Sequence, residues 1–328
     1  MDETHKNGAH ANESLRFVQL SDLHLSSINQ PNPLRLMNKR ILGYLSWRRK
    51  RRFTHQTWII DTAIEKIKQL DVDHYAITGD LTHIGLKEEF EQVAQWLSSV
   101  AGPEDITVIP GNHDLYVNEQ WQRSFALWKS YLYDENNSNE NINTNNALQK
   151  LNQLYPVVRI RKNVAFICLS SVFAAPWFRA TGFVAEQQLS RLQNLLSSKT
   201  LDKFCKILLI HHPVSLTHTA RRKSLINHAE LNNILKEYPV QLILHGHGHN
   251  SSLDSLICTN KNETPVIGIA SSSSTSQSEN HRAEFLVFDV KQIDSGWEIN
   301  KQSHKLDINS KRFVSETKES LHLPFTHG

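Results

Sequence analysis

Short apolar runs alternate with segments of helical periodicity along the first third of the chain. Strands are predicted over residues 16–20, 74–78 and 106–109, because each is a brief apolar run bounded by polar or turn-forming residues. Helices are predicted over residues 54–70 and 86–100, where apolar residues recur every three or four positions. This strand–helix–strand alternation predicts parallel pairing within an α/β sheet.

The second half of the sequence predicts another sheet. Its expected strands cover residues 157–160, 164–169, 206–210, 240–244, 266–270, 284–290 and 297–301, and its expected helices cover 185–196 and 231–236. Two mixed sheets with helices outside them give a four-layer α/β/β/α sandwich. Ligands of such sheets bind where the carboxyl ends of the strands meet, so the functional loops are expected at that edge.

The chain is expected to form one main domain over residues 15–305. A disordered N-terminal tail is predicted for residues 1–14, a solvated Asn-rich loop for 134–146 and a loosely packed C-terminal tail for 306–328. The first fourteen residues lack the apolar core of a signal peptide, which predicts a cytoplasmic location. No apolar run approaches the roughly 20 residues that span a bilayer.

Five polar motifs each directly follow one of the predicted strands. They are Ser21-Asp22-Leu23-His24, Gly79-Asp80-Leu81-Thr82, Gly111-Asn112-His113-Asp114, His211-His212-Pro213 and Gly246-His247-Gly248-His249. Together they supply carboxylate and amide oxygens and imidazole nitrogens, and they contain no thiol. This ligand set suits two divalent cations held side by side, which hydrolyse phosphate esters.

The spacing within the motifs suggests individual roles. Asp22 and His24 alternate in an extended segment and can face one ion, and His247 and His249 repeat that spacing. Asp80 is the best candidate for a carboxylate bridging both ions, because Gly79 allows a sharp turn at the strand end.

The remaining polar residues of the motifs complete the hypothesis. Asn112 and His211 are further candidate ligands, with His212 as the alternative to His211. His113 is left to stabilise the transition state or protonate the leaving oxygen, and Asp114 could orient it through a hydrogen bond.

Each motif alone is compatible with an ordinary turn or strand cap. Five of them in order, each ending an apolar strand, argue against coincidence. The three cysteines, Cys168, Cys205 and Cys258, have no metal-type spacing and are predicted to be buried free thiols of a reducing compartment. A catalytic cysteine is therefore disfavoured.

The motif set resembles that of the calcineurin-like metallophosphoesterases, which include purple acid phosphatases, serine/threonine phosphatases and bacterial cyclic-nucleotide phosphodiesterases. The resemblance covers about residues 16–290. It implies one metal on Asp22, His24, Asp80 and His249, a second on Asp80, Asn112, His211 and His247, and a catalytic His113 acting with a metal-bridging hydroxide. The His-His-Pro and Gly-His-Gly-His motifs resemble the small bacterial phosphodiesterase branch. The mixed nitrogen and oxygen ligands suit manganese, iron or zinc.

The substrate is expected to depend on a basic insert over residues 35–53. From Leu23 to Ile60 the chain has no acid and eight positive charges, so the rest of the chain is net acidic despite an overall charge of +3. Trp47, Arg48 and Arg49 are its candidate substrate or surface residues. The insert could contact an anionic membrane surface, bind a phosphorylated or nucleotide-bearing substrate, or form a core-packed helix with a solvated basic end. Nucleic-acid binding is disfavoured because the charge is local.

These observations favour a di-metal phosphodiesterase, with a cyclic nucleotide as one candidate substrate. The alternative is a membrane-associated hydrolase of a lipid-linked pyrophosphate such as UDP-2,3-diacylglucosamine, although the common members of that branch carry arginine where this chain has His113. A non-catalytic scaffold is disfavoured, because every expected ligand is present. The oligomeric state does not follow from the sequence.

Overall fold

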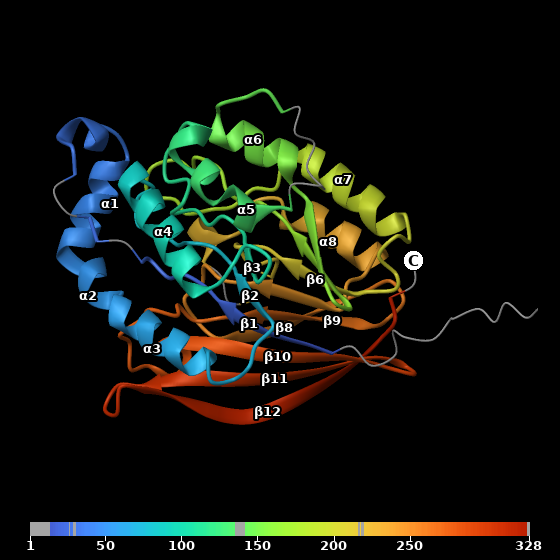
Figure 1. Ribbon diagram of the computed structural model, residues 1–328. Helices are drawn as coiled ribbons and strands as arrows, with labels where there is room; N and C mark the ends of the chain where they lie inside the picture. The colour runs from blue at the N-terminus through green and yellow to red at the C-terminus, as the bar shows by residue number, and fades with distance from the viewer. Residues whose placement is uncertain are drawn as a thin grey trace, which may run out of the picture.

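The computed structural model describes residues 14–25, 27–28, 31–134, 142–215, 217 and 220–326, which fold around two six-stranded sheets (Figure 1). The first sheet has the order β12–β11–β10–β1–β2–β3. Its strands are β1 (Ser14–Leu20), β2 (His74–Ile77), β3 (Ile106–Val108), β10 (Glu284–Ile293), β11 (Gly296–Asp307) and β12 (Arg312–Pro324). β1, β2 and β3 pair in parallel, whereas β10, β11 and β12 extend the sheet by antiparallel pairing.

The second sheet has the order β4–β5–β6–β7–β9–β8. Its strands are β4 (Val157–Arg161), β5 (Val164–Cys168), β6 (Cys205–Leu209), β7 (Leu242–His245), β8 (Ser252–Ile257) and β9 (Glu263–Gly268). The four central strands are parallel and the two edge strands, β4 and β8, are antiparallel to their neighbours. The prediction of two mixed sheets is therefore confirmed.

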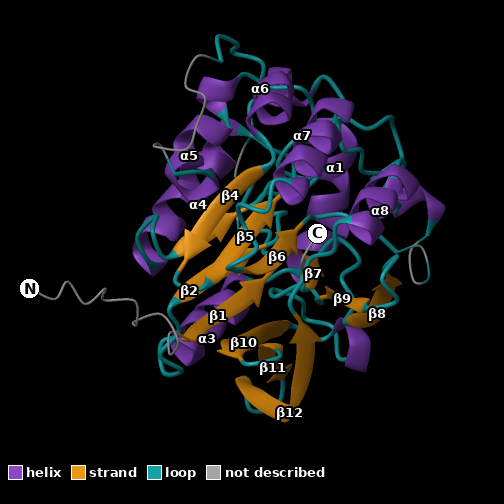
Figure 2. Ribbon diagram, turned by 90° about the vertical axis from the view of Figure 1, so that its right-hand side faces the viewer, coloured by secondary structure: helices purple, strands orange, loops and turns teal. Residues whose placement is uncertain are grey.

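Helices cover the outer faces of both sheets (Figures 1 and 2). The longer ones are α3 (Thr57–Ile67), α4 (Lys87–Val100), α6 (Ala147–Leu154), α7 (Glu186–Ser197) and α8 (His228–Glu237). The apolar faces of α7 and α8 pack on the second sheet, and α3 lies against the first. These contacts produce the predicted four-layer α/β/β/α sandwich.

Shorter helical segments lie between the longer elements. They are η1 (Pro33–Leu36), α1 (Arg40–Ser46), the π-helical turn η2 (Trp47–Arg51), α2 (Arg52–Thr54), η3 (Trp121–Arg123), η4 (Phe125–Trp128), α5 (Lys129–Leu132), η6 (Arg221–Lys223) and η7 (Glu279–His281). The basic insert thus forms a nearly continuous helical segment, α1–η2–α2. Because this segment lies between the first metal-type loop and α3, it can reach the edge of the sheets where the motifs gather.

The main core lies between the sheets. The ring of Phe17 on β1 is edge-on to Phe166 on β5, with centroids 5.2 Å apart, and stacks on Phe288 of β10 at 4.8 Å. All three side chains are fully buried. Aromatic contacts across the layers fix the spacing of the two sheets and thus the distance between the loops that each sheet contributes.

Three sequence predictions need adjustment or comment. The expected loose tail over 306–328 is wrong for residues 312–324, which form β12 against β11. As an edge strand with mostly exposed side chains, β12 lacks the apolar alternation that marks a half-buried strand. β8 was not predicted for the same reason. Residues 1–13 of the predicted N-terminal tail and 135–141 of the Asn-rich loop lie outside the described residues, and Ser14 belongs to β1.

The three cysteines are buried and unpaired, as predicted. Burial raises the pKa of the Cys168 thiol to about 12, which makes it a poor nucleophile. Within the described part of the chain, no helix combines the length and apolarity needed to cross a membrane.

Replacing Phe17 tests the packing between the sheets. Phe17→Ala should lower the free energy of unfolding by about 3–5 kcal/mol, because it removes a buried ring and leaves a cavity between two packed layers. Denaturant unfolding measures the change. Phe53→Ala is the matched control, since the Phe53 side chain is 59% exposed and its loss should cost little. Equal effects of the two substitutions would contradict this account of the core.

Candidate metal centre

All five motifs lie at the carboxyl ends of parallel strands. Asp22 follows β1, Asp80 follows β2, Asn112 follows β3, His211 follows β6 and His247 follows β7. Backbone hydrogen bonds join neighbouring loops: the Asp22 amide donates to Gly79 O at 2.9 Å. Each sheet therefore delivers its polar loops to a common edge, as the strand pattern predicts.

Five of the candidate ligands have left-handed backbone conformations. The φ angles are 51° at Asp22, 45° at His24, 57° at Asp80, 64° at His247 and 54° at His249. Such angles are costly for residues with a Cβ and concentrate at functional sites. They turn the chain sharply at the strand ends, so that the side chains converge instead of alternating.

Two glycines permit this convergence. A Cβ on Gly111 would collide with the backbone and carboxylate of Asp80, and one on Gly246 would collide with the Ser21 hydroxyl. Only a hydrogen atom fits at these two points. The loops of the two sheets can then approach closely enough to share ligands.

The first group of converging side chains comprises Asp22, His24, Asp80 and His249, whose ligand atoms lie within 4.8 Å of one another. His24 Nδ1 contacts Thr82 O at 2.8 Å, so Nε2 faces the group. His249 Nε2 lies 3.0 Å from Asp22 Oδ1. Fixing the second ring nitrogen on a backbone carbonyl orients the imidazole as metal sites require.

The second group comprises Asp80, His211 and His247 under the same 4.8 Å limit. His211 Nδ1 contacts Thr78 O at 2.7 Å, and its Nε2 lies 3.4 Å from Asp80 Oδ2 and 3.2 Å from Asn112 Oδ1. Asn112 therefore borders this group with its amide oxygen. Asp80 belongs to both groups and is the one carboxylate placed to bridge them.

The donor set fits two cations. His24 Nε2 and His247 Nε2 are buried and form no hydrogen bond with the described residues, although each residue belongs to a group, and the buried Asp22 Oδ1 faces the His249 ring. Burial lowers the pKa of His211, but Asp80 and Asp22 outweigh burial and raise that pKa to about 9. The carboxylates that hold a proton on His211 would equally attract a divalent cation.

The structure separates His211 from His212. His211 joins the second group, whereas His212 lies outside it, with Nδ1 2.8 Å from the Ser171 hydroxyl. Burial lowers the pKa of His212 well below its ordinary value. Of the two neighbours, His211 is the one placed as a ligand.

Asp114 does not contact the His113 ring, which corrects the predicted orienting hydrogen bond. Its carboxylate accepts from the backbone amides of Asp80, Leu81, Thr82 and Gly111 at 2.9–3.0 Å. Asp114 thus ties the loop after β2 to the loop after β3. The sequence could not distinguish this structural role from a catalytic one, because either role would place an acidic residue directly after His113.

His113 is oriented instead by a backbone carbonyl and an arginine. Its Nδ1 lies 2.5 Å from His83 O, and Arg51 Nη1 lies 2.9 Å from its Nε2. The His113 amide donates to Asp80 Oδ1 at 2.7 Å, which ties the backbone of this motif to the carboxylate that the two groups share. Burial and the Arg51 charge lower the pKa of His113 well below its ordinary value.

Arg51 and His55 are site residues that the motif analysis missed. His55 forms a further group with His24 and His249, and its Nδ1 lies 2.8 Å from the Ser273 hydroxyl. Arg51 lies in the basic insert and His55 follows its end. The sequence marks these two positions only by the absence of acidic residues around them. Which of eight cations reaches the site depends on how the helical segment docks.

The three predicted substrate residues of the insert have different surroundings. Trp47 is buried against Tyr44 and the site loop near His83, which argues against its predicted role as a substrate or surface residue. Arg49 lines a cavity of about 600 Å³ that also contacts Asn112 and His113. Arg48 is exposed and does not line that cavity.

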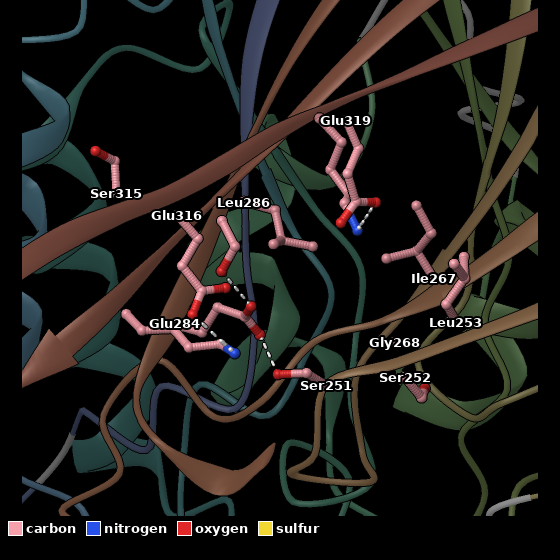
Figure 3. A pocket seen from close by; sticks show the side chains of 13 residues that line it. Ser251, Ser252, Leu253, Ile267, Gly268, Glu284, Leu286, Ser315, Glu316 and Glu319 are labelled. Atoms are coloured by element: carbon pink, nitrogen blue, oxygen red, sulfur yellow. Dashed lines mark hydrogen bonds and ion pairs between the residues drawn. The ribbon is translucent and has the colours of Figure 1, made fainter. Parts of the chain in front are cut away.

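A second cavity, of about 700 Å³, lies between β8–β9 and the strands β10–β12 and holds none of the candidate ligands (Figure 3). Its charged side chains engage one another: Lys305 pairs with Glu316 at 3.2 Å, and Lys301 pairs with Glu319 at 2.9 Å. The smaller cavity is the one that candidate site residues, Asn112 and His113, line.

Comparison with known proteins agrees with this geometry. The family model described as calcineurin-like phosphoesterase matches residues 15–251. The chain belongs to the calcineurin-like phosphoesterase family. It is therefore a metal-dependent phosphoester hydrolase, as the motif resemblance implies.

Relatives within and around the family are distant. A protein of Ruthia magnifica described as a probable cyclic nucleotide phosphodiesterase is 26% identical over 286 residues, covering 86% of this chain and 97% of the relative. A dimetal phosphatase from Danio rerio superposes with a TM-score of 0.57 at 15% identity, covering 92% of this chain and 98% of that one. A yellow lupin purple acid phosphatase gives a TM-score of 0.51 at 13% identity, covering 95% of this chain and 54% of that one. The two structures show the shared fold.

Asp80→Asn tests whether the two groups act as one centre. Because Asp80 belongs to both, the substitution should remove most of the manganese, iron or zinc bound at either group. Metal content per chain after dialysis, measured by mass spectrometry, gives the result. Asp61→Asn on the exposed face of α3 is the control and should retain full content. Unchanged metal content in Asp80→Asn would rule out the bridging assignment.

Proposed function

We propose that this protein hydrolyses phosphodiesters at a two-metal centre formed by Asp22, His24, Asp80 and His249 on one side and Asp80, Asn112, His211 and His247 on the other. The observation that carries the proposal is the sharing of Asp80 by two groups of buried ligand atoms. When bound, two cations supply Lewis-acid chemistry: they activate water and neutralise charge on the phosphoryl oxygens.

The residues of the chain hold the reacting groups in place. Thr78 O and Thr82 O fix the second nitrogens of His211 and His24, so both rings present Nε2 to the centre. Asp114 holds the backbone from Asp80 to Thr82, and that of Gly111 in the neighbouring loop, through its four amide contacts. Little reorganisation is then needed when the substrate binds.

His113 acts at the leaving oxygen. Its Nδ1 is committed to His83 O, which leaves Nε2 to meet the substrate beside the Arg51 guanidinium. With Nδ1 donating to His83 O, Nε2 carries a proton only in the imidazolium form, and that form can donate to the departing oxygen; Arg51 adds positive charge as negative charge develops.

The name of the Ruthia magnifica relative makes cyclic nucleotides the first substrates to test. They are phosphodiesters with an alkoxide leaving group, whose departure needs protonation. The His113 and Arg51 pair is placed to meet that need.

Removing His113 should slow hydrolysis of bis(p-nitrophenyl) phosphate by roughly 10²–10⁴-fold in kcat while metal content stays unchanged. The loss should be larger for a cyclic nucleotide, because p-nitrophenolate leaves readily without a proton and an alkoxide does not. Steady-state kinetics of His113→Ala with both substrates measure the difference.

His322→Ala on the exposed edge strand is the control and should keep wild-type rates. Near wild-type activity of His113→Ala toward both substrates would refute the role given to His113. Equal losses for the two substrates would assign it charge stabilisation rather than proton donation.

A second candidate function has its own observation. Apolar side chains of the insert, and Leu34 directly before it, are exposed near its cations: Leu34, Met37, Ile41, Leu45 and Phe53. Such a surface fits peripheral binding to an anionic bilayer at the inner face of a cytoplasmic membrane, where a lipid-linked pyrophosphate such as UDP-2,3-diacylglucosamine would be the substrate.

Vesicle flotation tests this candidate. Exchanging Arg48, Lys50 and Arg52 for glutamine should reduce partitioning onto phosphatidylglycerol vesicles on the order of 100-fold, at about 1 kcal/mol per charge. Exchanging three exposed lysines elsewhere, Lys199, Lys261 and Lys291, is the matched control. Absence of wild-type binding, or equal loss in both triple variants, would reject the membrane surface.

A further inference from the structure

The cavity of about 600 Å³ beside His113 is lined on opposite sides by the insert and by residues 178–180 and 222–223. Its cationic side chains are Lys39, Arg49, Arg51, Arg179, Arg222 and Lys223. No carboxylate of the described residues lines it. The positive charges therefore come from three separate segments and meet only in the folded protein.

These cations are not used for internal ion pairs. Among the described residues none of the six pairs with an acid, whereas Arg35 and Arg40 of the same insert both approach Glu119, at 3.9 and 3.1 Å. Burial lowers the pKa of Lys39, Arg51 and Lys223, as expected where a charge is drawn out of water. Gathering like charges without counter-ions costs stability, and a bound anion offsets that cost.

The positive charge of this cavity exceeds what is needed to bind the single phosphoryl group that is hydrolysed. A phosphodiester carries one negative charge, and the two metal groups together with Arg51 and His113 already face it. Arg49, Arg222, Lys223, Lys39 and Arg179 are additional. Guanidinium groups bind phosphoryl oxygens through paired N–H donors, and arginines make up four of the six cations.

We propose that this cavity is a subsite for a second phosphoryl group of the substrate, next to the one that is hydrolysed. The inference rests on the proposed function, because it assigns a substrate class to that centre. For a diphosphate diester the step balances as follows: water attacks one phosphorus, the anhydride P–O bond breaks, and the bridging oxygen leaves on the second phosphate. Two phosphate monoesters and the protons of the consumed water are the products.

Two kinds of substrate share this chemistry. The second phosphoryl group is joined through an anhydride oxygen in a diphosphate diester such as UDP-glucose, and is a separate monoester in a 5′-phosphorylated dinucleotide. Each has a counterpart with a single phosphoryl group: a cyclic nucleotide and an unphosphorylated dinucleotide. Comparing kcat/KM across the four compounds shows which arrangement the cavity accepts.

Each test variant has a control at the adjacent position in the sequence. Arg49→Gln and Arg222→Gln remove charges that line the cavity, whereas Arg48→Gln and Arg221→Gln remove adjacent charges that do not. The ratio of kcat/KM for a two-phosphoryl substrate to that for its single-phosphoryl counterpart should fall roughly 10–100-fold in the first pair, as for loss of a charged hydrogen bond. The second pair should keep the wild-type ratio.

Binding gives a readout independent of turnover. A methylene-bridged diphosphonate diester should bind more tightly than a phosphonate monoester by calorimetry, and Arg49→Gln and Arg222→Gln should abolish the difference without lowering the temperature of thermal unfolding below that of wild type. An unchanged rate ratio in these two variants, or an equal change in all four, would overturn the subsite. If wild type hydrolyses no phosphodiester, bis(p-nitrophenyl) phosphate included, the proposed function fails, and the binding experiment still decides the subsite.

Discussion

The position of the Asp80 carboxylate constrains the rest of this site. It accepts the His113 amide at 2.7 Å, faces His211 Nε2 at 3.4 Å and belongs to both groups of ligand atoms. A bridging carboxylate works only if two sets of ligands reach it from different directions. Because those sets follow strands of two different sheets, the spacing of the sheets and the turns at the strand ends have to agree.

Several local features that bring the two sets of ligands together lower the stability of the folded protein. Left-handed backbone at five candidate ligands and three buried acids in three neighbouring loops are each unfavourable alone. The acids are compensated locally: Asp114 by four amides, and Asp22 by the Ser21 hydroxyl and the His247 amide. The backbone strain is offset by the apolar core around Phe17, Phe166 and Phe288.

The sequence was informative wherever local pattern and function coincide. Buried parallel strands are apolar runs, and their carboxyl ends carry the polar motifs, so the sheets and the ligand loops were predictable together. β12 was missed because its side chains are mostly exposed, and Asp114 was misread because an acid in a catalytic motif can serve the backbone. Arg51 and His55 were out of reach, since their contribution depends on tertiary docking of a segment whose composition is merely basic.

The docking of that segment joins substrate selection to the metal loops. Arg40 donates to Ile84 O at 3.0 Å and to Gly85 O, in the same loop whose His83 O receives His113. At its other end the segment is held by Ser273: His55 Nδ1 contacts the Ser273 hydroxyl, and the Gln56 amide donates to Ser273 O. With both ends fixed, Arg51 and Arg49 have little freedom to move relative to His113. The loop over residues 83–85 therefore positions both the His113 imidazole and the segment that lines the cationic cavity, and a shift of this loop would displace both.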